Sequence, residues 1–289
     1  MKRLLLLRLL LPLTLLLPAA VDAAPDPDFH VYLCLGQSNM EGYPGIPESE
    51  RDWTDPRFRV LAAVDFPDLQ REQGKWYPAS PPLSRPSAGL GPADYFGRAL
   101  VARLPKHVSV GVVNVAVGGC RIELFDPATA ADYIASAPEW MRGPLAAYGQ
   151  NPYGRLVDMA RLAAKDGVIK GVLLHQGESN TGDREWPAKV KRVYENLLND
   201  LGLRAEDVPL LAGGVVAADQ DGRCASMNAI IATLPDTIPT ARFVPSDGCA
   251  ALPDRLHFSP DGYRELGRRY ADTLLGLSAA SATPASTAP

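Results

Sequence analysis

The sequence predicts an α/β fold, a three-layer α/β/α sandwich with a central parallel sheet of about five strands. Two observations indicate this fold. Short apolar runs rich in β-branched residues alternate along the chain with segments of helical periodicity. The apolar runs are continuous and do not alternate in polarity, which is typical of strands that are buried on both faces of a parallel sheet. Strands and helices in this order are joined by right-handed crossovers.

The N-terminal segment has the pattern of a secretory signal peptide. Three basic residues precede an apolar run over residues 9–17, and a small-residue cleavage pattern, Val21-Asp22-Ala23, follows it. The run is too short to span a membrane. We therefore expect residues 1–23 to be removed and the mature protein, without a membrane span, to be secreted or periplasmic.

The first expected strand covers 29–35 and ends abruptly in a tight Gly-Gln-Ser-Asn over 36–39. The connection that follows, 41–91, is rich in Pro, Trp, Asp and Arg and has no clear periodicity. Because loops this long are usually functional in a compact domain, we expect it to form a wall of a site at the strand end. A second irregular insertion, 126–151, carries three aromatic residues, Tyr133, Trp140 and Tyr148.

The remaining elements alternate regularly. Further strands are expected at the apolar runs 108–117, 168–175, 209–217 and 240–244. Helices are expected at 93–104, 153–165, 187–201, 225–234 and 259–275. In the second helix, Asp158, Arg161 and Lys165 share one polar face opposite an apolar side. In the last helix, Ser259 can cap the start and Pro260 suits the first position.

The composition limits the possible partners. The formal net charge is −4 at pH 7 and becomes more negative once the predicted signal peptide is removed. An acidic chain without basic clusters argues against nucleic acid or an anionic membrane as a partner. The length suits one domain over 24–277, followed by a small-residue tail over 278–289 that we expect to be disordered. No pattern in the sequence indicates an oligomeric state.

The chain contains four cysteines, and an exported protein can form disulfides. No Cys-x-x-Cys spacing is present, which argues against zinc or thioredoxin-like chemistry. Cys34 lies inside the first strand and is expected to be a buried thiol. We expect a disulfide between Cys224 and Cys249, because the helix and strand between them run out and back. Such a bond would add ~3 kcal/mol on the chain-entropy model. Four free thiols, or a pairing with Cys120, are the alternatives.

Ser38 is a candidate nucleophile because it follows the first expected strand directly. Open α/β sheets bind their ligands at the carboxyl ends of the strands. The alternative is a structural serine that caps a helix or forms a turn. An activated serine also requires a general base, an orienting acid and an oxyanion hole.

The candidate base is His257, one of only four histidines in the chain. Asp254 precedes it by three residues, so a tight turn can bring the carboxylate to Nδ1, fix the tautomer and stabilise the imidazolium. His175 also ends a strand at this edge, whereas His30 and His107 are expected at the opposite edge. The alternative is that Asp254 and His257 only shape the entry to the last helix.

Two further strand ends carry candidate oxyanion donors. The second strand ends in Gly118-Gly119, and a glycine lets a backbone N–H approach a developing oxyanion without a side chain in the way. The third strand ends in His175-Gln176, and the Gln176 amide could donate as well. A plain turn and a hydrogen-bonded strand-to-loop transition are the structural alternatives.

Four blocks of the chain together resemble the SGNH hydrolase superfamily, and more narrowly its carbohydrate esterase branch of sialate O-acetylesterases and acetylxylan esterases. In chain order the blocks are Gly36-Gln-Ser-Asn-Met40, Val117-Gly-Gly119, His175-Gln-Gly-Glu178 and Asp254-Arg-Leu-His257. The resemblance covers nearly the whole expected mature chain. It implies an SGNH, flavodoxin-like sheet.

The resemblance also implies roles for individual residues. Ser38 would be the nucleophile and His257 the general base. The oxyanion hole would consist of the Ser38 and Gly118 N–H groups and the Gln176 side chain, which stands where the wider superfamily has asparagine. We expect Asp254 to be the acid partner, with Glu178 as the alternative that this branch also allows.

Three further residues are candidate substrate contacts. Gln37 and Asn39 flank the serine, and Arg121 follows the glycine turn. No motif supports the assignment of Arg121.

We therefore expect a secreted serine esterase that removes O-acetyl groups from a carbohydrate, such as acetylxylan or a sialic acid, through an acyl-enzyme and without metal or other cofactor. One alternative is a non-catalytic carbohydrate-binding protein on the same fold. The other is a metal-dependent hydrolase that uses His175, Glu178, Asp254 and His257 as ligands.

Overall fold

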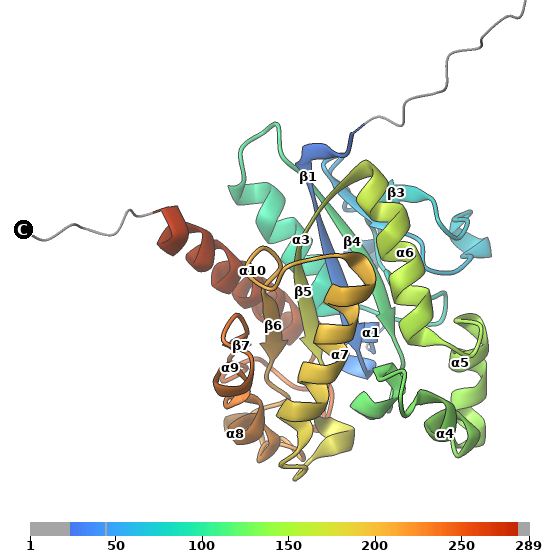
Figure 1. Ribbon diagram of the computed structural model, residues 1–289, viewed down its shortest axis with the longest axis vertical. Coiled ribbons are helices and arrows are strands. Elements are labelled where there is room, and N and C mark those ends of the chain that lie inside the picture. The colour runs from blue at the N-terminus through green and yellow to red at the C-terminus, as the bar shows by residue number, and fades with distance from the viewer. Residues whose placement is uncertain (1–23, 44, 283–289) are drawn as a thin grey trace, which may run out of the picture.

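The computed structural model describes residues 24–43 and 45–282. A central sheet has the strand order β3-β2-β4-β1-β5-β6-β7 and lies between two layers of helices (Figure 1). The strands are β1 Asp26–Gly36, β2 Phe58–Leu61, β3 Trp76–Pro78, β4 Ser109–Ala116, β5 Gly167–His175, β6 Leu210–Gly213 and β7 Arg242–Val244. All neighbouring pairs are parallel except β2 and β3. The predicted three-layer sandwich is therefore confirmed.

The sheet is wider than expected. All five predicted strands are present, and β2 and β3 extend the sheet at one edge to seven strands. Both added strands lie in the long connection that we expected to be irregular. They are only four and three residues long, too short to produce a periodic pattern in the sequence.

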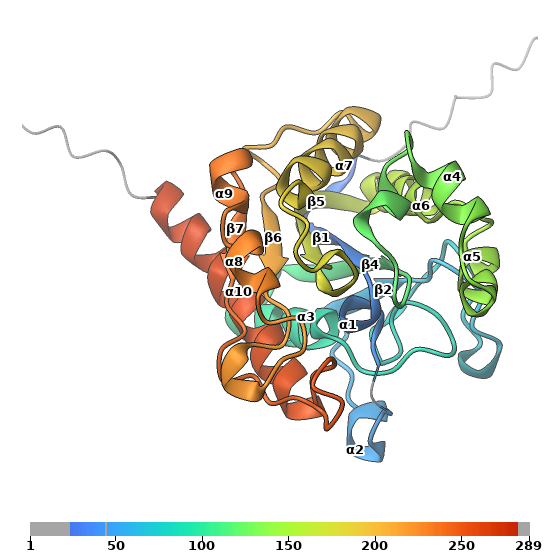
Figure 2. The ribbon, with the colours of Figure 1, turned by 90° about the horizontal axis from the view of Figure 1, so that it is seen from below.

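The helices form two layers, which Figure 2 shows on opposite sides of the sheet. One layer contains α6 (Pro152–Asp166) and α7 (Trp186–Leu201), and the other contains α3 (Pro92–Arg103) and α10 (Pro260–Ala282). Each layer packs on its own apolar core: in β1, Leu33 and Leu35 face the first core, whereas Cys34 faces the second. Because both faces of the sheet are covered, the strands read as continuous apolar runs.

Shorter helices lie mainly in the connections. These are α1 Ser38–Glu41, α2 Glu48–Arg51, α4 Ala130–Ala135, α5 Arg142–Ala147, α8 Met227–Ile231 and α9 Leu234–Thr237. Short 3₁₀ segments cover Pro67–Leu69, Ile122–Phe125, Glu139–Met141, Glu178–Asn180 and Ala218–Gln220. The single helix expected over 225–234 is divided into α8 and α9, and Pro235 lies in the first turn of α9, a position that proline favours.

The two ends of the chain differ in what the structure describes. The predicted signal peptide, 1–23, lies outside the described residues. At the other end, α10 continues to Ala282 and so includes the first residues of the segment expected to be a tail. The last seven residues, 283–289, also lie outside the described part. Among the described helices, none is both long and apolar enough to cross a bilayer.

The predicted disulfide between Cys224 and Cys249 is wrong. All four cysteines fall within the described residues, and all are free. Cys224 packs against the core under α6 and α7, and its thiol lies 3.7 Å from the Glu178 carbonyl oxygen. Cys249 is buried in the other core, under α3 and α10. The helices and strand between them therefore return the chain to the opposite core.

Candidate active site

The carboxyl ends of three central strands meet at one level. Gly36, the last residue of β1, pairs with Ala116 of β4 on one side and with His175 of β5 on the other. A Cβ atom on Gly36 would lie 2.1 Å from the His175 carbonyl oxygen, so only glycine fits this approach. The Gln37 N–H then donates to the same oxygen at 3.0 Å. This packing fixes the chain immediately before Ser38.

Ser38 is the first residue of the short helix α1 and not part of an open loop. The residue is only 8% exposed, and its Oγ lies 2.9 Å from Nε2 of His257. Its backbone N–H is among the first of the helix, which have no acceptor within the helix. Both groups are therefore free of helical hydrogen bonding and available at the strand end.

Ser38, His257 and Asp254 form a continuous hydrogen-bonded chain. Nδ1 of His257 lies 2.7 Å from Oδ2 of Asp254. Oδ1 of Asp254 accepts the backbone N–H groups of Leu256 and His257 at 2.9 and 3.0 Å. A charged carboxylate can only accept hydrogen bonds, so Nδ1 carries the proton and Nε2 is left to accept the Ser38 hydroxyl proton.

The surroundings of Asp254 favour its charged form. Partial burial alone would raise the pKa of this carboxyl, but the hydrogen bonds from the His257 ring and from two backbone N–H groups outweigh that effect and lower the pKa. The group therefore remains a carboxylate at neutral pH. A carboxylate in this place can orient the imidazole and stabilise an imidazolium.

Asn39 does not contact the cavity; it holds the His257 segment to the end of β1. Its Nδ2 donates to the Leu256 carbonyl at 3.0 Å, and its Oδ1 accepts the Phe258 N–H at 3.3 Å. The Tyr263 hydroxyl donates to the same Oδ1 at 2.6 Å. Asn39 is fully buried, and its position does not support the prediction that it contacts substrate. Its side chain forms hydrogen bonds with the residues on both sides of His257.

Glu178 lies next to Asn39 and not next to His257. Its Oε1 accepts the Asn39 amide at 2.5 Å and lies 3.8 Å from Nε2 of His175. Burial raises the pKa of Glu178 to about 7 and lowers that of His175 to about 3. Of the two carboxylates that we considered as partners of His257, only Asp254 contacts its ring. Glu178 reaches the histidine only through Asn39.

Tyr43 covers one face of the candidate base. Its ring is stacked on the His257 imidazole with 3.5 Å between centroids and 6° between planes. An aromatic face so placed limits rotation of the imidazole and attracts it when it is protonated. We did not predict this contact. The only signal in the sequence was an aromatic residue in the long connection after Ser38.

The Gln176 amide is turned away from the cavity. Its Nε2 lies within hydrogen-bond distance of three oxygens, on Gln37, Cys120 and Asn180, at 3.1, 3.2 and 2.8 Å. Its Oε1 accepts the Trp186 indole N–H at 2.5 Å. These contacts brace the strand ends and do not support the prediction that this side chain donates to an oxyanion.

The glycine turn that we expected to supply a backbone donor lies beside Ser38. A Cβ on Gly118 would lie 3.7 Å from the Ser38 Cβ, which places the glycine turn next to the serine. The Gly118 N–H donates to Oε2 of Glu41 at 3.1 Å. Gln37, a candidate substrate contact, lines the same cavity. Its Oε1 already accepts hydrogen bonds from the Gly177 and Ser179 N–H groups at 3.5 and 3.3 Å.

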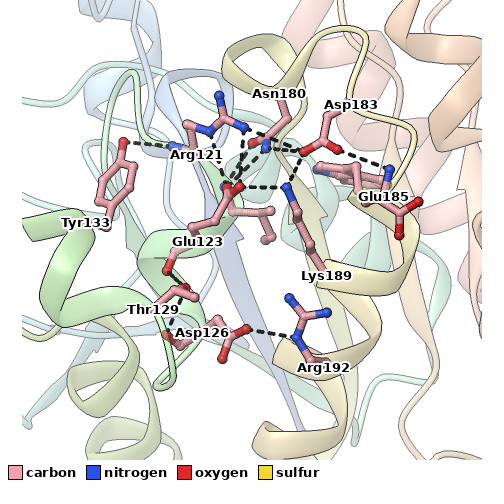
Figure 3. Close-up of polar contacts among 12 residues, drawn as sticks. Arg121, Glu123, Asp126, Thr129, Tyr133, Asn180, Asp183, Glu185, Lys189 and Arg192 are labelled. Carbon is pink, nitrogen blue, oxygen red and sulfur yellow. Dashed lines mark hydrogen bonds and ion pairs between the residues drawn. The ribbon is translucent and has the colours of Figure 1, made fainter.

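Arg121 belongs to the charged cluster that Figure 3 shows. It is not among the residues that line the cavity. It lies 3.3 Å from Glu123 and 3.6 Å from Asp183, and Lys189 of α7 contacts the same two carboxylates at 2.8 and 2.6 Å. Burial opposes the effect, but hydrogen bonds from Lys189 and Asn180 lower the pKa of Glu123 to about 2. The cluster ties two strand-end loops to α7, so the prediction that Arg121 contacts substrate is not supported.

The cavity above Ser38 has a volume of about 550 Å³ and is lined by residues of both long connections. Tyr43 and Trp140, which are 53% and 61% exposed, form part of its wall. The Trp140 ring packs so closely on Gly119 that a Cβ there would be 2.5 Å from it. Among the described residues, no three His, Cys, Asp or Glu side chains are grouped to hold a metal ion.

Comparison with known proteins gives one family match and several structures of similar fold. The model of a family described as carbohydrate esterase, sialic acid-specific acetylesterase, matches residues 28–276. Protein AT4G34215 of Arabidopsis thaliana is similar in structure, with a TM-score of 0.67 and 22% identity over 87% of this chain and 99% of that chain. NanS is similar with a TM-score of 0.65 and 20% identity over 89% of this chain and 99% of that chain. XAC1771 of Xanthomonas citri is described as a carbohydrate acetylesterase. Its TM-score is 0.56, with 20% identity over 86% of this chain and 57% of that chain. At these identities the three structures support the fold.

The raised pKa of Glu178 predicts a pH-dependent effect on stability. Because the folded-state pKa, about 7, is above the ordinary 4.5, the folded state binds the proton more tightly, and stability falls as pH rises between these values. Glu178→Gln removes this loss and keeps an oxygen for Asn39. In urea unfolding, the free energy of unfolding of the variant minus that of the wild type should increase across this window, by on the order of 2 kcal/mol.

The matched control is Glu195→Gln, which removes a carboxylate that is about half exposed on α7. A stability difference for Glu178→Gln that is constant or decreases as pH rises would contradict the prediction.

Proposed function

The chain belongs to the carbohydrate esterase family described as sialic acid-specific acetylesterases, and from this premise we propose that it removes O-acetyl groups from a carbohydrate by a serine-esterase mechanism. The observation that carries the proposal is the chain of hydrogen bonds from Ser38 through His257 to Asp254. This arrangement supplies a nucleophile and a general base that line one cavity, and an orienting carboxylate that contacts the base.

In the first half of the proposed reaction, Ser38 Oγ attacks the acetyl carbonyl carbon while its proton passes to Nε2 of His257. The resulting imidazolium is stabilised by the Asp254 carboxylate. When the tetrahedral intermediate collapses, the bond between the acetyl carbon and the sugar oxygen breaks, and the sugar oxygen takes the proton from His257. Ser38 is left acetylated, and the sugar leaves as an alcohol.

In the second half, water attacks the acetyl-serine and gives its proton to His257. Collapse of this intermediate returns the proton to Ser38 Oγ and releases acetic acid, which ionises to acetate in solution. The negative oxygen of both intermediates needs preorganised donors at 2.7–3.1 Å. We assign this role to the N–H group of Ser38 itself and to that of Gly118, whose turn lies beside the serine.

The walls of the cavity support a carbohydrate as the alcohol part of the substrate. Tyr43 and Trp140 present large exposed aromatic surfaces beside Ser38, and such surfaces bind the apolar faces of sugar rings while polar groups fix their orientation. Acetylated xylan and O-acetylated sialic acids both fit this class. Acetate release from a panel of these glycans is the experiment that identifies the substrate.

The place of action follows from the N-terminus. We propose that residues 1–23 are a secretory signal peptide, since a basic start, an apolar run and a small-residue cleavage pattern follow one another there. The mature esterase domain would then be exported and meet extracellular or periplasmic glycans. N-terminal sequencing of the exported protein tests this assignment.

Ser38→Ala should reduce ester hydrolysis by at least about 10³-fold, because only the remaining donors and binding groups would act. The fold should be retained, since the change removes one oxygen at the cavity and no core packing. Hydrolysis of p-nitrophenyl acetate and thermal unfolding measure the two effects. Ser136→Ala, at an exposed site after α4, is the control. A Ser38→Ala variant with wild-type turnover would exclude the serine mechanism.

Asp254→Asn should lower kcat far more than Glu178→Gln, with little change in KM for either. The asparagine can donate to Nδ1 and so favour the wrong tautomer, a defect worth up to about 10⁴-fold in enzymes of this kind. Glu178→Gln changes a group that lines the cavity but reaches His257 only through Asn39. Steady-state kinetics of both variants test the ranking. The opposite order would transfer the orienting role to Glu178.

A further inference from the structure

A second carboxylate, that of Glu41, lies in the cavity beside Ser38 and has no role in the reaction described above. Glu41 is the last residue of α1, three residues after the serine. Its Oε2 accepts the Gly118 N–H at 3.1 Å. The same oxygen would be 2.8 Å from a Cβ on Gly118. The carboxylate therefore occupies one of the two N–H groups that we assign to the oxyanion.

The charge of Glu41 is balanced by Arg85, which comes from the long connection. Oε1 of Glu41 lies 2.5 Å from Nε of Arg85, and both side chains are largely buried. Burial raises the pKa of Glu41, while Arg85 and the Gly118 N–H oppose that shift. Ser84 fixes the approach of this segment, because its hydroxyl donates to the Glu41 carbonyl at 2.7 Å. Arg85 is thus held at Glu41 independently of Gly118.

The contact with Gly118 conflicts with acyl transfer. The N–H carries one hydrogen, and an oxyanion would need it at 2.7–3.1 Å. A carboxylate oxygen and an oxyanion in the same place would repel each other strongly in a partly buried cavity. One of the two must leave the donor during the reaction.

On the basis of the proposed function, we propose that Glu41 is a positioning residue that occupies the Gly118 N–H in the free enzyme and is displaced by the acyl oxygen of the substrate. Rotation of the terminal carboxylate torsion, which is broad, moves both oxygens, and the flexible Arg85 side chain follows Oε1 while Oε2 leaves Gly118. A neutral ester carbonyl is a weaker acceptor than a carboxylate, whereas an oxyanion competes on equal terms. Displacement therefore takes place as negative charge develops on the acyl oxygen.

The first test compares Glu41→Gln and Glu41→Asp with the wild type. Glutamine has a similar shape but no charge, and aspartate keeps the charge for Arg85 but is one methylene shorter and does not reach Gly118. Phenylboronic acid is the probe, because Ser38 Oγ adds to its boron, with the proton passing to His257, and the anionic tetrahedral adduct places a boronate oxygen toward the oxyanion donors. Both variants should bind it more tightly, by roughly five- to tenfold, with a similar gain in kcat/KM for p-nitrophenyl acetate.

The outcomes separate a positioning role from a merely structural one. Thermal unfolding shows whether each variant folds, and Glu48→Gln, an exposed carboxylate on α2, is the matched control with wild-type affinity. Variants that fold as the wild type does but bind the boronic acid equally or less tightly overturn the proposal. That result says nothing against hydrolysis by the wild type. Failure of the proposed function would appear differently, as wild-type protein without esterase activity.

A second measurement needs no variant. In a crystal structure of the wild-type boronic acid adduct, a boronate oxygen should lie at the Gly118 N–H, with Oε2 of Glu41 moved off it and Oε1 still on Arg85. An adduct in which Glu41 keeps its hydrogen bond to Gly118 overturns the proposal.

Discussion

The close approach of β1 to β5 is the constraint on which the site depends. Gly36 lies so near the His175 carbonyl that no side chain fits between them, and the parallel register brings β4 to the same level. This approach turns the chain into α1 with Ser38 at its start. It also places the glycine turn after β4 beside the serine, so backbone packing, and not a side-chain contact, sets the positions of nucleophile and donor.

Asp254 and Glu178, the two carboxylates considered as partners of His257, differ in environment, and this difference separates their roles. Asp254 is partly exposed and accepts hydrogen bonds from the ring and two N–H groups, so its pKa is lowered. Glu178 is buried, and its pKa is raised to about 7. Only the first is a dependable negative partner for an imidazolium. Glu178 instead supports Asn39, which joins the C-terminal His257 segment to the end of the first strand.

The sequence predicted those features that local chemistry decides. The five longer apolar runs, the serine at a strand end and the Asp254–His257 spacing each carry their own pattern, and the structure brings these three side chains together. The directions of side chains in the strand-end loops depend on packing between distant segments. For this reason Gln176 and Asn39 were assigned to the cavity although both are buried in hydrogen-bond networks. The stacking of Tyr43 on His257 and the contact between Glu41 and Gly118 also depend on packing between distant segments, and no motif in the sequence predicted them.

Covalent labelling tests the central claim, that Ser38 is the nucleophile activated by His257, most directly. The wild-type protein would be treated with a fluorophosphonate, and the adduct located by intact mass and peptide mapping. The account predicts one adduct, on the peptide that contains Ser38, which forms in parallel with the loss of esterase activity. Protein that is denatured before treatment should form no adduct. An adduct on another residue, or full loss of activity without an adduct on Ser38, would contradict it.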